Sequence, residues 1–152
     1  MKGYIQNIRG IKAELLVQEK LWRYGYGVER MPSIQKTDPR GQPYDLLVNK
    51  KYGVEVKSAM LRNRTWTFYG KHLLGADRGL IDVFAFVFFY PDDTYKVSYM
   101  KVGAFLKRNM KKTYYVDLRP NDKDLIKSPI MVFGKRRIAK RNSMRRWRAK
   151  KL

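Results

Sequence analysis

Several side chains on which enzymes commonly rely are scarce or missing in this 152-residue chain. It has no cysteine, which excludes disulfides, zinc fingers, iron–sulfur clusters and thiol nucleophiles. Its single histidine, His72, is too few for a two-histidine metal site, and we expect neither a Ser-His-Asp triad nor an HNH-type centre around it. Any chemistry must therefore use carboxylates, lysine or hydroxyls, with or without a hard metal ion.

Long apolar runs are also missing. No stretch approaches the roughly 20 consecutive apolar residues that span a bilayer. The chain starts Met-Lys-Gly-Tyr-Ile-Gln-Asn, without the apolar core of a signal peptide. We therefore expect an intracellular protein (cytoplasm or nucleoid, or host cytoplasm for a viral protein) with no membrane partner, and its length fits one domain.

Acidic residues are few: 13 Asp and Glu against 34 Lys and Arg give a net charge of +21. A field of this size favours a polyanion, and nucleic acid is the usual partner. An anionic membrane is the rival, and a ribosomal or chromatin-like coating protein is a third possibility. Ten of the basic residues and no acidic residue fall in residues 135–152. We therefore predict a folded domain over residues 1–134 and a basic C-terminal arm over 135–152.

Hydrophobic periodicity predicts an α/β fold with a mixed central sheet flanked by helices. Helical spacing of apolar residues predicts a helix over 7–24, and Gly25 follows as its C-terminal cap. A second, short helix is expected over 102–109. Strands are expected at 28–31, 46–48, 53–59, 65–69, 82–90, 95–100, 114–118 and 130–133. The nearly continuous apolar run 82–90 is typical of a central strand covered on both faces.

Two of these strands contain charges in otherwise apolar sequence. Asp45 precedes the strand 46–48, and Glu55 and Lys57 lie within 53–59, one short turn later. Residues two apart on a strand point to the same face, so Glu55 and Lys57 are neighbours there. If the strands form a hairpin, Asp45 joins them. Buried charges are costly unless they pair or hold a metal ion, so the pattern indicates a catalytic patch.

Carboxylates of this kind suit Mg²⁺, which takes one or two protein carboxylates plus water and substrate phosphate. We expect Asp45 and Glu55 to bind it, with the backbone carbonyl of Val56 as a further ligand, and Mn²⁺ to substitute. Lys57 would orient the attacking water or stabilise developing charge. Glu14, on the first helix, would reach the metal through water or hold a second ion.

Each residue alone also has a structural explanation. Glu55 and Lys57 would make an ion pair on a half-exposed strand, Asp45 would be a turn residue, and Glu14 a solvated helix residue. The combination is harder to explain structurally, because the chain has only four glutamates and two of them fall in this pattern.

The order of these motifs resembles a known family. Gly10-Ile11-Lys12-Ala13-Glu14, Gly25-Tyr26-Gly27-Val28, Pro43-Tyr44-Asp45 and Glu55-Val56-Lys57 resemble the PD-(D/E)XK nuclease superfamily, and within it the archaeal-type Holliday junction resolvases, including viral and phage forms. The resemblance covers about residues 3–60. It implies a restriction-endonuclease-like core with Asp45, Glu55 and Lys57 as the catalytic centre, assisted by Glu14. Ser33 is the candidate for the loop serine of the family, in a loop from Pro32 to Pro43 that is longer than in compact resolvases. Tyr44 separates Pro43 from Asp45, and the basic arm is not a family feature.

Basic residues near these motifs are candidates for DNA contacts, because phosphates supply most non-specific affinity. Those that follow the Glu55 strand are expected near the scissile phosphate. The full set is Arg9, Lys12, Arg30, Arg62, Arg64, Lys71, Arg136, Arg137, Arg145, Arg146 and Arg148.

The sequence thus predicts a Mg²⁺-dependent endonuclease. The resemblance implies a homodimer that nicks opposing strands of four-way DNA junctions. The alternatives are a sequence-specific, homing or repair endonuclease with the same centre, and a nucleic-acid-binding protein without catalysis.

Overall fold

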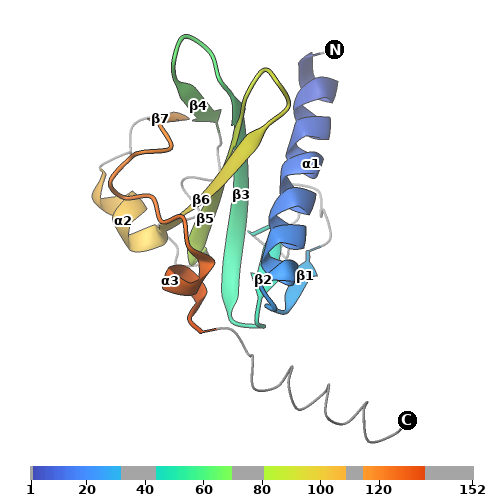
Figure 1. The fold of residues 1–152 in the computed structure, drawn as a ribbon, viewed down its shortest axis with the longest axis vertical. Coiled ribbons are helices and arrows are strands. Elements are labelled where there is room, and N and C mark those ends of the chain that lie inside the picture. Colours follow the sequence, from blue (N-terminus) through green and yellow to red (C-terminus); the bar gives the residue numbers. More distant parts are fainter. Residues whose placement is uncertain (1, 32–43, 70–80, 109–114, 136–152) are drawn as a thin grey trace, which may run out of the picture.

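The protein is described from a computed structural model, which covers residues 2–31, 44–69, 81–108 and 115–135, with only the backbone at residues 2–7. The elements follow one another as α1 (Lys2–Arg23), β1 (Val28–Arg30), β2 (Leu46–Val48), β3 (Tyr52–Met60), β4 (Trp66–Tyr69), β5 (Val83–Phe89), β6 (Tyr95–Lys101), α2 (Val102–Lys107), β7 (Tyr115–Leu118) and α3 (Pro129–Phe133) (Figure 1). No helix in these ranges is long and apolar enough to cross a membrane.

A five-stranded mixed sheet forms the centre, in the order β1-β2-β3-β5-β6. Strands β3 and β5 are parallel, and the other neighbours are antiparallel. Strands β4 and β7 form a separate two-stranded antiparallel sheet. The expected mixed central sheet with flanking helices is therefore confirmed, although β4 and β7 lie outside it.

One face of the central sheet is covered by α1, which Figure 1 shows running alongside β3. The helix inserts Ala13, Val17 and Leu21, one turn apart and fully buried, against β-strand residues such as Val54 and Val56. Helix α3 packs on the same side. This cluster forms the first half of the core.

The second half lies on the opposite face, between the central sheet and the β4–β7 ribbon with α2. Its aromatic residues alternate along β5, where Phe84, Phe86 and Phe88 all point to this side. Phe68 of β4 meets Phe86 and Phe88 edge to face, at ring centroid distances of 4.8 Å and 5.2 Å. Every residue of β5 is buried, which confirms the prediction of a central strand covered on both faces.

The turn between β2 and β3 fixes the hairpin that contains the candidate site residues. Asn49 and Lys50 both have φ of 54°, the left-handed conformation that a two-residue hairpin turn requires and that asparagine tolerates well. The Asn49 side chain also accepts a hydrogen bond from the Gly27 N–H at 3.0 Å. The predicted antiparallel hairpin is confirmed, with Leu46 opposite Val54.

The prediction of a strand at 130–133 is wrong, because these residues form α3. Pro129 occupies the first turn, where its missing N–H is not needed, and Gly134 ends the helix with φ of 85°. One helical turn buries Pro129, Val132 and Phe133 together, whereas a strand would split Val132 from Phe133. The Phe133 ring then contacts the Tyr99 ring of β6 at 5.6 Å.

Candidate active site

Asp45 is held by hydrogen bonds from both its backbone and its side chain. Its N–H donates to the Val54 carbonyl at 2.9 Å, and its carbonyl accepts from the Met31 N–H at 2.8 Å. Its Oδ2 accepts from the Val56 N–H at 2.8 Å. Strands β1 and β3 therefore fix Asp45 where β2 begins, and its carboxylate faces β3.

The residue before Asp45 is fixed by a close packing contact. The Tyr44 ring covers Gly53 so tightly that a Cβ at Gly53 would lie 2.6 Å from Tyr44 Cδ1. The Gly53 N–H donates to Asp82 Oδ2 at 2.8 Å, and its carbonyl accepts from the Asp82 N–H at 2.9 Å. A side chain at position 53 would therefore collide with the Tyr44 ring in its present position.

Glu55 and Lys57 lie side by side on β3, on the face opposite α1. The strand alternates, with Val54 and Val56 in the α1 half of the core and Ala59 in the other half. Lys57 Nζ lies 3.2 Å from Glu55 Oε1, and the two side chains are only 11% and 8% exposed. The expected shared face is observed, and the pair is buried rather than half-exposed.

Val56 links the two carboxylates through the backbone. Its N–H points to the β2 side of the strand, where it meets Asp45 Oδ2. The N–H and C=O of one strand residue point to the same side, so the Val56 carbonyl also faces the side on which Asp45 lies. Strand β2 pairs with β3 only as far as Val54, so the backbone hydrogen bonds between these two strands do not reach the Val56 carbonyl.

Burial raises the pKa of Glu55 from 4.5 to about 7. Lys57 opposes this rise, whereas the negative charges of Asp45 and Glu14 add to it. One lysine is therefore not enough to balance these carboxylates at neutral pH. Binding of a further cation, either a proton or a metal ion, reduces the repulsion between the carboxylates at such a site.

Glu14 approaches the same group of charges from α1. Burial and the negative charge of Asp45 raise its pKa, and Arg30 opposes the rise. Arg30 of β1 donates from Nε and Nη2 to Glu14 Oε2, at 3.2 Å and 3.0 Å. Arg30, which we expected to contact DNA, is thus the partner of Glu14, a pairing that no local pattern in the sequence indicates.

The donor set suits Mg²⁺ bound by few protein ligands. Among the residues that the structure describes, no group of three or more His, Cys, Asp or Glu is arranged to hold a metal ion. Mg²⁺ does not need such a cage, because it retains several waters and uses one or two carboxylates. Asp45 and Glu55, with the Val56 carbonyl beside them, offer that number of ligands.

The other predicted contacts lie apart from this centre. Arg62 and Arg64 are exposed at the β3–β4 turn, which Figure 1 shows at the opposite end of β3 from β2. They follow Glu55 by seven and nine residues, so Arg62 is about 20 Å further along the extended strand. Their expected position near the scissile phosphate, like their contact with DNA, stays a prediction.

Two of the remaining candidates are on α1, and the others are outside the described residues. Lys12 Nζ lies over the Phe89 ring, 5.6 Å from its centroid, and Arg9 is half-buried. The residues outside are Ser33, Lys71, Arg136, Arg137, Arg145, Arg146 and Arg148, together with the rest of the basic arm beyond residue 135.

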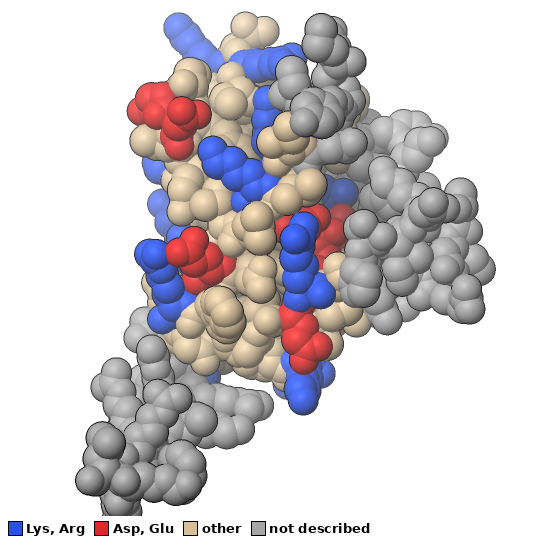
Figure 2. All heavy atoms as spheres, turned by 90° about the vertical axis from the view of Figure 1, so that its right-hand side faces the viewer, with Lys and Arg blue, Asp and Glu red and all other residues tan. Residues whose placement is uncertain are grey.

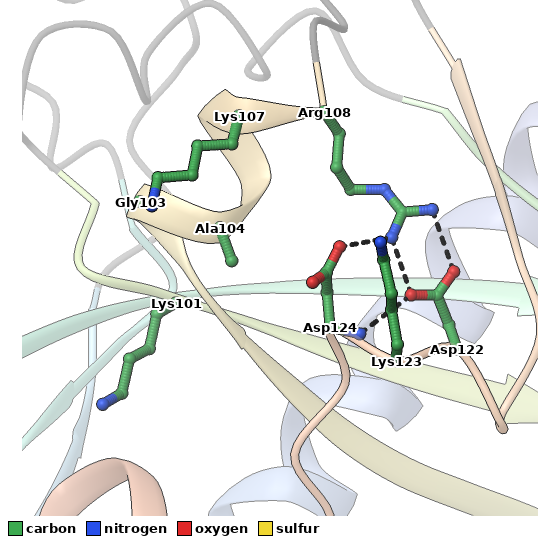
Figure 3. Close-up of a pocket in the computed structure, with 8 residues that line it drawn as sticks. All are labelled: Lys101, Gly103, Ala104, Lys107, Arg108, Asp122, Lys123 and Asp124. Carbon is green, nitrogen blue, oxygen red and sulfur yellow. Dashed lines mark hydrogen bonds and ion pairs between the residues drawn. The ribbon is translucent and has the colours of Figure 1, made fainter.

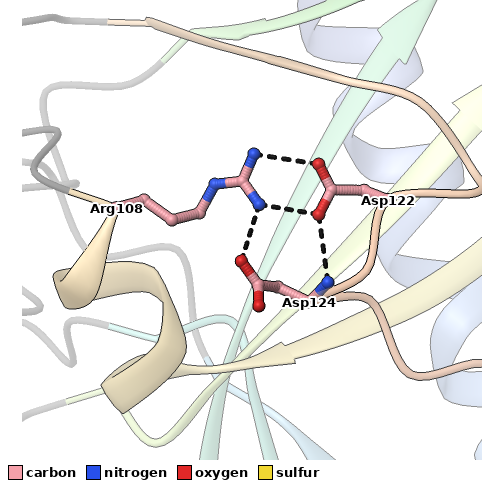
Figure 4. Close-up of polar contacts among 3 residues, drawn as sticks. All are labelled: Arg108, Asp122 and Asp124. Carbon is pink, nitrogen blue, oxygen red and sulfur yellow. Dashed lines mark hydrogen bonds and ion pairs between the residues drawn. The ribbon is translucent and has the colours of Figure 1, made fainter.

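A hollow of about 1040 Å³ lies beside α2 (Figure 3). Neither Asp45 nor Glu55 lines it. Arg108 forms one of its walls and binds Asp122 at 2.6 Å and 2.9 Å and Asp124 at 2.8 Å (Figure 4). Its pKa is raised and that of Asp122 lowered, chiefly by their mutual hydrogen bonds. This cluster ties α2 to the segment before α3. No local pattern in the sequence indicates this cluster, because Asp122 and Asp124 follow Arg108 by 14 and 16 residues.

The chain matches no protein-family model, and no curated protein matches its sequence significantly. Solved structures similar to it include two nucleases. The bacterial homing endonuclease I-Ssp6803I shares 20% identity over 95% of this chain and 95% of its own, with a TM-score of 0.49. The Holliday junction resolvase Hjc of the archaeal hyperthermophile Archaeoglobus fulgidus shares 15% identity over 84% of this chain and 97% of its own, with a TM-score of 0.48. Both TM-scores are below 0.5, which is too low to transfer a function or a residue role to this chain.

Proposed function

We propose that this protein is a Mg²⁺-dependent endodeoxyribonuclease of the PD-(D/E)XK type, and that its substrate is branched DNA. One observation supports the chemistry above all others. The Asp45 carboxylate accepts a hydrogen bond from the N–H of Val56, the residue between Glu55 and Lys57 in the sequence. Glu55 and Lys57 form a buried ion pair of their own. The spacing of the motif in the sequence thus corresponds to one compact group of charges.

In this proposal Asp45, Glu55 and the Val56 carbonyl hold the metal. When bound, Mg²⁺ lowers the pKa of a coordinated water and neutralises charge on the phosphate. Asp45 needs no rearrangement for this role, because hydrogen bonds to β1 and β3 already fix it. Glu55 gives up the proton that its raised pKa favours, so the affinity for metal rises with pH.

Lys57 is proposed to act on the reacting groups. Its ammonium is nearly buried and close to Glu55, so it is presented at the site rather than free in solvent. From there it would orient the attacking water or stabilise charge on the phosphate oxygens. Glu14 is proposed to assist from α1, with Arg30 fixing its carboxylate. Ser33 stays a candidate by the resemblance alone.

The net charge of +21 supports a DNA substrate, because phosphate contacts supply most of the affinity for nucleic acid. The preference for a four-way junction is inferred from the resemblance in the sequence motifs. A junction needs two symmetric nicks, and one site of this kind cuts one strand. A homodimer with two sites is therefore part of the proposal.

The test compares a four-way junction with linear duplexes that contain the sequences of its arms, with Mg²⁺, with Mn²⁺ and with EDTA. We expect metal-dependent nicks in opposing strands of the junction and little cutting of the linear duplexes. Cutting at one sequence in a linear duplex would identify a sequence-specific nuclease instead. Equal cutting of both forms would remove the preference for branched DNA.

A Glu55→Gln variant separates catalysis from binding. It should bind the junction as the wild type does in a gel-shift assay, because the basic surface is unchanged, yet it should not cut. If neither protein cuts with Mg²⁺ or Mn²⁺ while both bind DNA, the protein is a binding protein and the nuclease proposal fails.

A further inference from the structure

Helix α1 has a second apolar stripe, on the side away from the sheet. Ile8, Ile11, Leu15 and Trp22 are 49%, 49%, 48% and 64% exposed. Their separations of three, four and seven residues become a regular three-four-three-four pattern when Gln18 is included. We name these five residues the α1 stripe. Large apolar side chains rarely gather on a surface that faces only water.

The spacing of the α1 stripe is that of a coiled-coil seam. Apolar residues that alternate three and four apart form the a and d positions of a heptad, which pack between the side chains of a second helix. Ile8, Leu15 and Trp22 are then a positions, and Ile11 and Gln18 are d positions. A hollow of about 500 Å³ lies along the stripe from Leu15 to Trp22, with room for a side chain of the other helix.

The charges beside the α1 stripe fit another protein helix better than a polyanion. Arg9, Lys12 and Arg23 lie along one margin with Glu19, which pairs with Arg23 at 2.7 Å, and Glu14, which pairs with Arg30, lies along the other. Figure 2 views the molecule from the side of α1 and shows uncharged surface with acidic as well as basic side chains around it. DNA or an anionic membrane would favour lysine and arginine alone at these margins. The mixture of signs is typical of coiled-coil flanks.

We propose that the α1 stripe binds the α1 stripe of a second copy of this chain, with the two helices antiparallel about a two-fold axis. In this arrangement a positions face d positions, so Ile11 packs on the partner's Trp22 and Leu15 on the partner's Gln18. The same register sets Lys12 beside the partner's Glu19, and the two-fold axis repeats that ion pair. Contacts that repeat in this way are the rule in a two-fold dimer.

The competing arrangements bring like charges together. A parallel pair in register sets Glu14 beside the partner's Glu19. An antiparallel pair shifted by one heptad sets Lys12 beside the partner's Lys12 and Glu14 beside the partner's Glu14. Like charges at these flanking positions disfavour a pairing, which is how coiled coils select their orientation. Charge and apolar spacing thus favour the same register.

The proposal does not depend on the nuclease chemistry, and one experiment tests it separately. Sedimentation equilibrium of the full chain, without DNA, gives the dimer dissociation constant. Glu19→Lys replaces two attractive pairs across the interface with two repulsive ones, removes the Arg23–Glu19 pair within each helix, and should weaken the dimer by about tenfold or more. Lys12→Glu should do the same, and the double variant Lys12→Glu/Glu19→Lys should restore the dimer. Restoration by a second charge change cannot come from misfolding.

Leu15→Ser tests the apolar part, and it should give a monomer with an unchanged helical circular dichroism spectrum. Met131→Ser is the matched control, because Met131 is 69% exposed on α3, outside the α1 stripe, and its loss should leave the dimer intact. A wild-type protein that is monomeric at all concentrations overturns the proposal, as does a dimer that the charge variants do not affect. Junction cleavage by such a monomer would leave the proposed nuclease chemistry standing but would overturn the homodimer in the proposed function.

Discussion

The metal-free protein should lose stability as the pH rises, because Glu55 must ionise inside the fold. Its pKa is about 7 in the folded protein, against 4.5 for an unperturbed glutamate. Between these values the folded state holds a proton that the unfolded state has released, so the free energy of unfolding falls as pH increases. Each pKa unit corresponds to about 1.4 kcal/mol, so the full effect is about 3 kcal/mol.

Glu55→Gln removes this ionisation and keeps a side chain of similar size that can still accept a hydrogen bond from Lys57. In EDTA, the unfolding free energy of the wild type relative to the variant should fall by about 2 to 3 kcal/mol between pH 5 and pH 8. Urea denaturation at pH 5, 6.5 and 8 measures this difference. The catalytically disabled variant should thus be the more stable protein at pH 8.

Glu29→Gln, the same chemical change at an exposed position on β1, is the matched control and should follow the wild type. Adding Mg²⁺ at pH 8 should stabilise the wild type and have much less effect on Glu55→Gln, since a ligand stabilises only the state that binds it. Parallel pH profiles for wild type and Glu55→Gln would show that the fold does not raise the pKa of Glu55, and would refute the reasoning.

Four further outcomes are expected. Asp45→Asn should abolish cleavage and weaken Mg²⁺ binding in calorimetry while DNA binding persists; unchanged Mg²⁺ affinity would count against Asp45 as a ligand. Gly53→Ala should lower both stability, by about 1 to 3 kcal/mol, and cleavage, because the new methyl group displaces the Tyr44 ring; thermal melts and nicking assays check this. Tyr99→Phe should stabilise the fold by about 1 kcal/mol, because the buried Tyr99 hydroxyl finds no hydrogen-bond partner among the described residues. Removal of residues 135–152 should reduce the slope of DNA affinity against salt, and an unchanged slope would contradict the arm as a DNA contact.

The parts of the fold that were predicted correctly depend on local signals. The β2–β3 hairpin follows from a short polar turn between two apolar segments, and the burial of β5 from its unbroken apolar run. Helix α3 was missed because Ile130 to Phe133 resemble a strand in composition. The Pro129 and Gly134 boundaries were the stronger signal.

The candidate site was predictable only in part. Residue spacing on β3 brings Glu55 and Lys57 together without further information. The hydrogen bond from Val56 to Asp45 requires the register of the hairpin, and the pairing of Arg30 with Glu14 requires α1 to pack beside β1. Such contacts depend on tertiary structure, because nothing in the local sequence brings their partners together.

The same property that makes β5 a good central strand makes it a hazard before the protein has folded. Its seven residues, Val83–Phe89, contain no charge, proline or glycine, which is the composition of a segment prone to intermolecular β-aggregation. Its parallel pairing with β3 joins residues about 30 positions apart, so it is expected to form slowly. Asp82 precedes the segment, and Pro91, Asp92 and Asp93 follow it closely. We expect these residues to act as gatekeepers that oppose aggregation during folding, and three of the chain's nine aspartates are among them.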